Sequence, residues 1–114
     1  MNKILLICLT LSISTLTINA ESITFAEQQK TKNIDKAQRI FRNKLQRKCG
    51  YTAGHFAQQH TKEEWETLHE EGKFQEEFAR MCPKGIKVAK DEWMEPLYLF
   101  AIRYAEDSDV RPRC

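Results

Sequence analysis

The chain has 114 residues, of which 41% are hydrophobic and 30% are charged, and it contains only four glycines and three prolines. This composition is typical of a folded domain and excludes a disordered or collagen-like chain. The length allows one domain rather than a large two-domain enzyme. A formal net charge of +2 is too small to attract nucleic acid or an anionic membrane through the overall field.

The first twenty residues have the organisation of a secretory signal peptide. Lys3 supplies a positive charge, residues 4–11 form a short apolar run, and Ala20 is a small residue at the expected cleavage point. The apolar run is shorter than the ~20 residues that a membrane span needs. We therefore expect residues 1–20 to be removed, leaving about 94 residues with no membrane span in the periplasm or outside the cell.

The segment after the signal peptide is polar and then becomes periodic. Residues 21–32 show no sustained period and are expected to form a flexible lead-in. From residue 33 the apolar residues recur at three- and four-residue spacing, which predicts a helix capped by Asn33 and ended by Gly50. The expected apolar stripe consists of Ile34, Ala37, Ile40, Phe41 and Leu45.

The next stretches predict a loop and two helices. Residues 50–60 contain two glycines and are expected to form a loop with one helical turn. Thr61 and Glu64 form a capping box, which predicts a helix with Trp65, Leu68 and His69 facing inward and Gly72 as its cap. A third helix is predicted from about residue 73 to residue 81, with Pro83 just beyond its end.

A last helix is predicted to begin at or after residue 91, because Pro96 is tolerated only in a first helical turn. Four helical stretches and the lack of an alternating strand pattern predict a small all-α domain over residues 33–114. Aromatic residues lie on nearly every inward stripe. We expect Trp65 and Trp93 at the centre of the core, since aromatic side chains bury the most area.

Three cysteines remain after removal of the signal peptide: Cys49, Cys82 and Cys114. In an oxidising compartment an odd number allows at most one internal disulfide. Closing any of the three loops stabilises the fold by roughly 3.5–4.5 kcal/mol, and the pairs differ by less than about 1 kcal/mol. Loop entropy therefore leaves the pairing open.

The order of the helices resembles that of the class I c-type cytochromes. Residues 37–41 are similar to the opening helix of that family, residues 61–68 to its middle helix and residues 93–105 to its closing helix. In this register, Leu45, Lys48 and Cys49 stand where the family has the two cysteines and the histidine of its Cys-x-x-Cys-His motif. The resemblance implies a cytochrome c-like bundle of about four helices without covalently attached haem.

The chain also resembles a set of small exported bacterial proteins that are often labelled cytochrome c. The shared pattern consists of Cys49-Gly50, Phe56-Ala57-Gln58-Gln59-His60-Thr61, Glu64-Trp65, Cys82-Pro83 and the terminal Cys114. This second resemblance implies a related fold and a place in periplasmic electron-transfer or redox chemistry.

Three side chains are candidates for non-covalent haem ligation, namely Cys49, His55 and His60, because thiolate and imidazole groups bind iron. The same three residues with Cys82 would supply four zinc ligands, although their spacing is looser than in known small zinc sites. The preferred interpretation is a disulfide between Cys49 and Cys82, with no metal or cofactor. That bond would tie the two sides of the core where haem would cross-link a cytochrome.

The preferred pairing leaves the third cysteine without a partner in its own chain. Cys114 would be free, or would link two copies of the chain in a dimer. Alternatively, Cys114 would pair with Cys49 or Cys82 and hold the tail.

The charges are distributed unevenly, with six basic residues in the range 36–48 and seven glutamates in the range 63–77. Such runs commonly form two solvated faces that attract each other. The functional interpretation is a basic docking face for an acidic periplasmic redox protein. We thus expect a non-enzymatic accessory or binding module of redox chemistry. The alternatives are an electron-transfer haem protein with unusual ligands and a thiol-based redox protein that uses the three cysteines.

Overall fold

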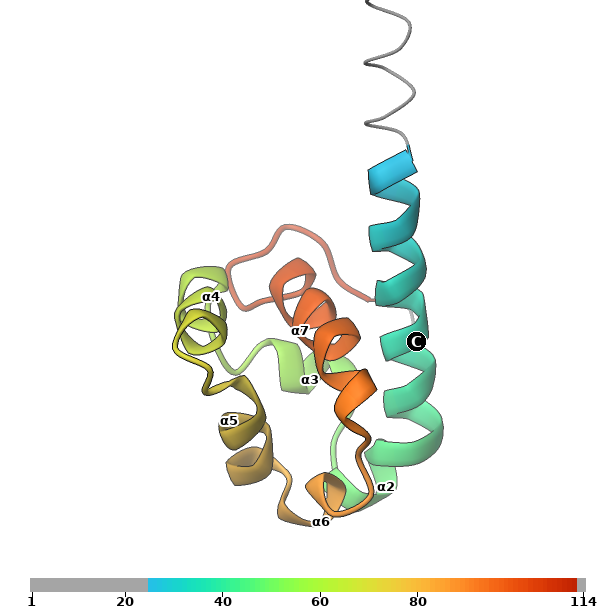
Figure 1. Cartoon of the computed structure of the whole chain (residues 1–114), viewed down its shortest axis with the longest axis vertical. Coiled ribbons are helices and arrows are strands. Elements are labelled where there is room, and N and C mark those ends of the chain that lie inside the picture. Colours follow the sequence, from blue (N-terminus) through green and yellow to red (C-terminus); the bar gives the residue numbers. More distant parts are fainter. Residues whose placement is uncertain (1–24, 113–114) are drawn as a thin grey trace, which may run out of the picture. The chain divides into compact units, whose positions relative to one another are not determined.

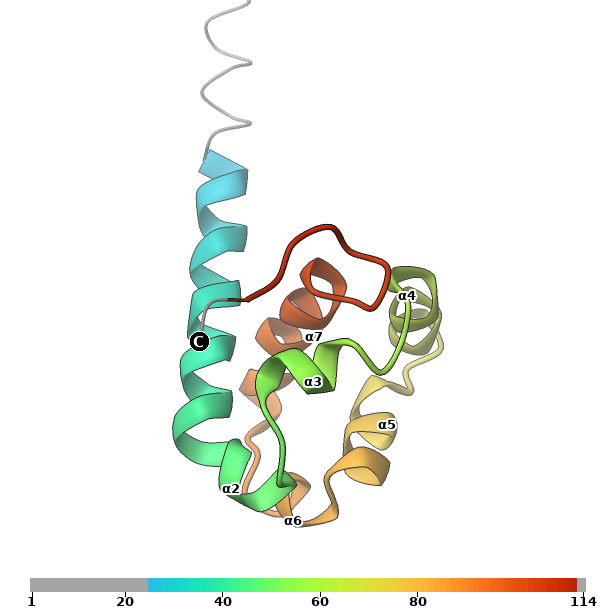
Figure 2. The same cartoon turned by 180° about the vertical axis from the view of Figure 1, so that it is seen from behind.

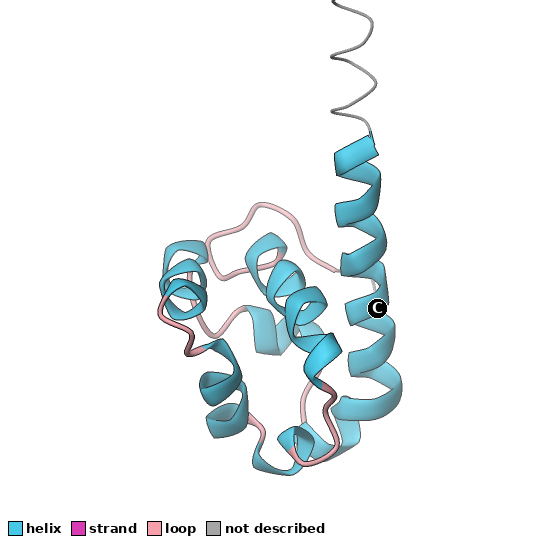
Figure 3. Ribbon diagram, viewed as in Figure 1, coloured by secondary structure: helices cyan, strands magenta, loops and turns pink. Residues whose placement is uncertain are grey.

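The structure is a computed structural model that describes residues 25–112. Within this range the regular elements are helices, and no strand is present (Figure 3). The all-α prediction is confirmed. The predicted signal peptide and Cys114 lie outside the described residues. The chain divides into two units at residues 31 and 32, and we describe each by itself.

In the first unit, residues 25–31 are helical and exposed, whereas the sequence pattern led us to expect a lead-in without regular structure. The apolar period is absent, but Ala26 and the run of Glu, Gln and Lys that follows it are good helix formers. The Thr31 hydroxyl also donates to the Glu27 carbonyl oxygen at 3.0 Å, one turn back. Propensity rather than amphipathic packing therefore accounts for this segment, and Asn33 is an internal residue of a helical stretch rather than its cap.

In the second unit, residues 32–40 are α-helical and continue into the π-helical turn η1 (Phe41–Leu45) and the short helix α2 (Gln46–Cys49). Four members of the predicted stripe, Ile34, Ala37, Phe41 and Leu45, are buried, and Ile40 packs against them. Gly50 ends α2 as predicted. Its φ of +82° lies in the left-handed region that glycine adopts without strain.

Helices α3 (Ala53–Ala57) and α4 (Lys62–Glu70) both begin with a threonine cap. The predicted capping box is present, since the Thr61 hydroxyl accepts from the Glu64 amide at 3.2 Å and the Glu64 carboxylate accepts from the Thr61 amide at 2.8 Å. After α4, the amides of Gly72 and Lys73 donate to the carbonyls of His69 and Leu68, and Gly72 has a φ of +71°. This is a Schellman cap.

The remaining helices are α5 (Phe74–Met81), α6 (Pro83–Ile86), the 3₁₀ turn η2 (Asp91–Trp93) and α7 (Met94–Arg103). Helix α6 was not predicted. Pro83 lies just beyond the end of α5 and is the first residue of α6. Proline suits this first position because the backbone N–H that it lacks would have no partner within the helix. The prediction for Pro96 is confirmed, since it lies in the first turn of α7.

The core lies between these helices. Helix α7 runs between the helical segment that ends in α2 and the pair α4 and α5 (Figures 1 and 2). The largest fully buried side chains are Trp65, Phe41, Phe56, Phe78, Phe100, Leu45, Leu97 and Cys82. Trp65 is central, as expected, and its indole N–H donates to the Ala57 carbonyl at 2.8 Å.

Two aromatic expectations need correction. Trp93 is buried, but at the edge of the core, where the Lys90 ammonium lies 5.9 Å from its ring centroid. His69 does not face inward; it is exposed and stacks on Tyr98 with ring centroids 3.8 Å apart. No helix within residues 25–112 combines the length and apolar character needed to cross a membrane.

Candidate functional site

Cys49 and Cys82 form a disulfide, with their Cα atoms 4.9 Å apart. The pairing preferred from the sequence is therefore confirmed. The bond joins the end of α2 to the residue between α5 and α6, two segments that are separated by 33 positions in the chain. It holds the end of α2 beside α6, and the two helices lie at the same end of the domain (Figure 1).

Gly85 of α6 packs directly on this disulfide. A Cβ atom at position 85 would lie 2.4 Å from the Cys82 sulfur and 3.2 Å from the Cys49 sulfur, so any larger residue would push the bond aside. Both sulfur atoms are thus covalently paired and enclosed by α6. While the bond is intact, Cys49 presents no thiolate to iron, and the four-ligand zinc set loses both of its sulfur donors.

The two candidate histidines are engaged by other residues. His55, on α3, is exposed, and its Nε2 lies 3.1 Å from the Gln59 side-chain nitrogen. His60 precedes α4, is half-buried, and meets the Trp65 ring edge-on with centroids 4.7 Å apart. Within residues 25–112, no three His, Cys, Asp or Glu side chains are arranged to hold a metal ion.

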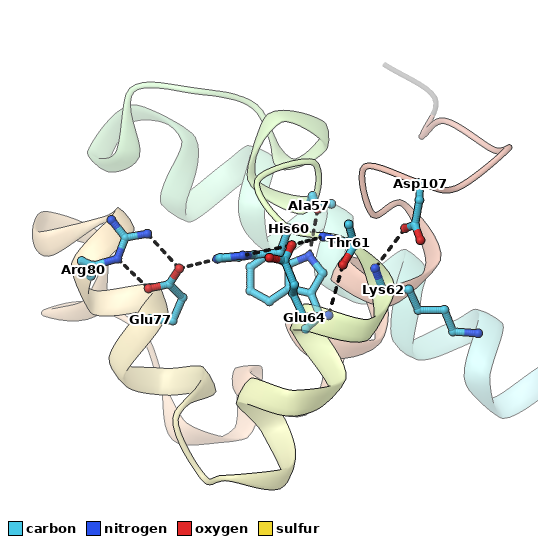
Figure 4. A network of polar contacts seen from close by, with 9 residues as sticks. Ala57, His60, Thr61, Lys62, Glu64, Glu77, Arg80 and Asp107 are labelled. Carbon is cyan, nitrogen blue, oxygen red and sulfur yellow. Dashed lines mark hydrogen bonds and ion pairs between the residues drawn. The ribbon is translucent and has the colours of Figure 1, made fainter.

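His60 belongs to a polar network that the sequence did not predict (Figure 4). Its Nε2 is hydrogen-bonded to a carboxylate oxygen of Glu77, on α5. Arg80, one turn later, donates to both oxygens of the same carboxylate at 2.6 and 2.8 Å. Because a carboxylate only accepts, His60 donates from Nε2. The network ties the start of α4 to α5.

The partners shift the acidity of two carboxyl groups in this network. The hydrogen bonds from Arg80, supported by that from His60, lower the pKa of Glu77 to about 2, although partial burial opposes the shift. The pKa of Glu64 is also lowered, first by the hydrogen bond from the Thr61 amide and then by that from the Thr61 hydroxyl. Glu77 is therefore ionised in the folded protein at neutral pH.

The core contains Leu45, the residue that the predicted resemblance aligns with a thioether cysteine. Leu45 is fully buried and belongs to the same hydrophobic cluster as Phe41, Phe56 and Trp65. Among the described residues, no buried side-chain nitrogen or oxygen lacks a hydrogen-bond partner.

The basic run of the sequence is exposed on the helical segment that ends in α2, and we call its side chains together the basic face. It consists of Lys36, Arg39, Arg42, Lys44, Arg47 and Lys48, all of which are exposed. In the part of the chain that the structure describes, none of the six forms an ion pair with a carboxylate. The glutamates of residues 63–77 therefore form no ion pair with the basic face, although charge runs of this kind commonly form two faces that attract each other.

The basic face ends at a hollow of about 450 Å³, which we call the Lys90 hollow. One side comes from η1 and α2, and the other comes from the segment that connects α6 to η2 and from η2 itself. The lining residues are Asn43, Lys44, Arg47, Lys48, Val88, Lys90 and Trp93. Four of them are cationic and none is acidic, so the site favours an anionic ligand with an apolar part.

Compared with family models, with curated proteins and with solved structures, the chain shows no match.

Proposed function

We propose that the chain is a non-enzymatic accessory module of periplasmic redox chemistry that docks an acidic redox protein through its basic face. In this proposal the helices have a cytochrome c-like arrangement, but the core is completed by aromatic side chains and a disulfide instead of haem. The observation that carries the proposal is the concentration of six exposed basic residues, without a carboxylate partner in the described chain, on one helical segment.

Charge complementarity gives such a surface a definite physical effect. A positive patch accelerates encounter with an acidic partner and fixes its orientation, and it contributes less to affinity once the complex has formed. A small overall charge with a local concentration of basic residues is suited to this task, because attraction is strongest around one helical segment. The disulfide supports export to an oxidising compartment, where such bonds persist.

Docking can be measured with an acidic electron-transfer protein of the flavodoxin type immobilised on a sensor surface. We expect binding that weakens steeply as NaCl rises from about 20 to about 300 mM, since exposed charges are screened over this range. Neutralising Lys36, Arg39 and Arg42 together to glutamine should slow association by about tenfold.

The matched control neutralises Lys62, Lys84 and Lys87, which are exposed and lie outside the basic face. This variant loses the same charge and should slow association by less than about threefold. Equal losses in the two triple variants would show that net charge alone matters. Binding that is independent of salt would contradict the docking proposal directly.

A further inference from the structure

We infer that the Lys90 hollow is the specificity site of the docking surface, and that it takes an apolar side chain carried by an acidic segment of the partner protein. The inference rests on the proposed docking function. It adds a concave site that distinguishes partners by the side chain they can insert. Its basis is the juxtaposition of four cationic side chains with an apolar floor in one hollow of about 450 Å³.

Val88 and Trp93 supply the apolar part of the lining of the hollow, which we call its apolar floor. Val88 is 45% exposed and is one of the few large hydrophobic side chains exposed in the described chain. Trp93 is buried on its inner side and lines the hollow with its outer side. Single exposed valines are ordinary, but a valine beside an indole in a concave surface offers contact area to an inserted side chain.

The rim supplies charge on two sides. Lys44, Arg47 and Lys48 come from the basic face, while Lys90 stands on the opposite side with its ammonium over the Trp93 ring. An apolar group on the floor would thus be surrounded by cations. The matching ligand is a peptide segment in which carboxylates flank one large apolar residue.

The same features argue against other anions. Inorganic phosphate would use the cations but not Val88 or Trp93, and it favours convergent backbone or Arg donors over separate exposed lysines. A lipid surface needs a broad array of basic side chains, whereas this hollow is concave and the formal net charge of the chain is only +2.

The disulfide preorganises the two sides of the hollow. On one side, Lys48 directly precedes Cys49 in the sequence. On the other side, Val88 and Lys90 follow α6, which begins at the residue after Cys82. Fixing the two sides before binding reduces the entropy lost on association. The location of the cross-link therefore suits a recognition site at this end of the domain.

Two synthetic peptides test the inference with the full mature protein. One has three glutamates on each side of a central phenylalanine, and the other has alanine at the centre; both are acetylated and amidated. By isothermal titration calorimetry, we expect the phenylalanine peptide to bind about five- to tenfold more tightly, because only its ring reaches the apolar floor. Tryptophan fluorescence should change with the phenylalanine peptide, because Trp93 lines the hollow.

Variants then locate the effect. Val88→Ser should bring the two affinities within about twofold of each other, while Lys90→Gln should weaken both peptides. Lys87→Gln is the control, since Lys87 is exposed, adjacent in sequence and outside the hollow. It should preserve the preference for phenylalanine. Circular dichroism melting confirms that each variant is folded.

Three results would overturn the inference: equal affinities of the two peptides for the unaltered protein, binding of neither peptide, or a preference that survives Val88→Ser. None of them would remove salt-dependent docking of the acidic redox protein through Lys36, Arg39 and Arg42. Failure of the hollow and failure of the docking face are therefore distinguishable.

Discussion

Replacing Cys49 and Cys82 together by serine is expected to lower the free energy of unfolding by about 3–4 kcal/mol. The bond closes a loop between residues separated by 33 positions, and it thereby restricts the unfolded chain. The chain-entropy model gives about 3.7 kcal/mol for a loop of this length. The substitution also removes sulfur atoms that pack against Gly85.

The measurement is urea denaturation of the mature protein, followed by circular dichroism. Both the disulfide protein and the double variant should carry Cys114→Ser, so that no other pair of cysteines can form. This background isolates the effect of the single cross-link. A loss below about 1 kcal/mol would mean that the bond adds little to the packing that surrounds it.

Glu77→Gln should cost about 2 kcal/mol at pH 7 and should remove much of the acid sensitivity of the fold. The pKa of Glu77 is lowered from its ordinary value of 4.5 to about 2 in the folded protein, chiefly by the hydrogen bonds from Arg80. An unfolded chain therefore binds this proton more readily than the folded one. The stabilisation is complete above pH ~4.5 and is lost as the pH falls from about 4.5 to about 2.

The full shift would correspond to roughly 3 kcal/mol, but the Arg80 side chain is 68% exposed, so solvent screening lowers the expected value to about 2 kcal/mol. Urea denaturation at pH 7, 4.5, 3 and 2 measures the effect. Glu76→Gln is the control, because Glu76 is an exposed neighbour on α5. It should change stability by less than about 0.5 kcal/mol. Parallel stability curves for the unaltered protein and Glu77→Gln would contradict the assignment.

The local elements of the fold could largely be predicted from the sequence. The stripe from Ile34 to Leu45 and the capping box of Thr61 and Glu64 depend only on residues three or four positions apart. Helical residues 25–31 were missed because their helix has good propensity but no apolar stripe. Helix α6 was missed because four residues are too few to establish a period.

The candidate sites were less predictable because they depend on tertiary packing. His60 and Glu77 are 17 positions apart, and no local spacing indicates that they meet. The Lys90 hollow combines α2 with the segment between α6 and η2, which the sequence left without a structural assignment. The disulfide was correctly preferred, but the reason was that it would tie the two sides of the core where haem cross-links a cytochrome, and loop entropy did not select it.

In the function that we propose, the cross-link and the aromatic core together take the place that haem has in a c-type cytochrome. Cys49, which the proposed resemblance aligns with the axial histidine, is bonded to Cys82. His60 is held by Glu77, and Leu45 fills space at the position of a thioether cysteine. Cys49 and His60, two of the three candidate haem ligands, thus have partners within the chain.

The measurement that tests this claim most directly is the visible absorption spectrum of the mature protein, purified from the periplasm of a host with active haem maturation. We predict a folded, colourless protein with no Soret band. A Soret band corresponding to one haem per chain, and lost in Cys49→Ala or His60→Ala, would contradict the account and identify an electron carrier with unusual ligands.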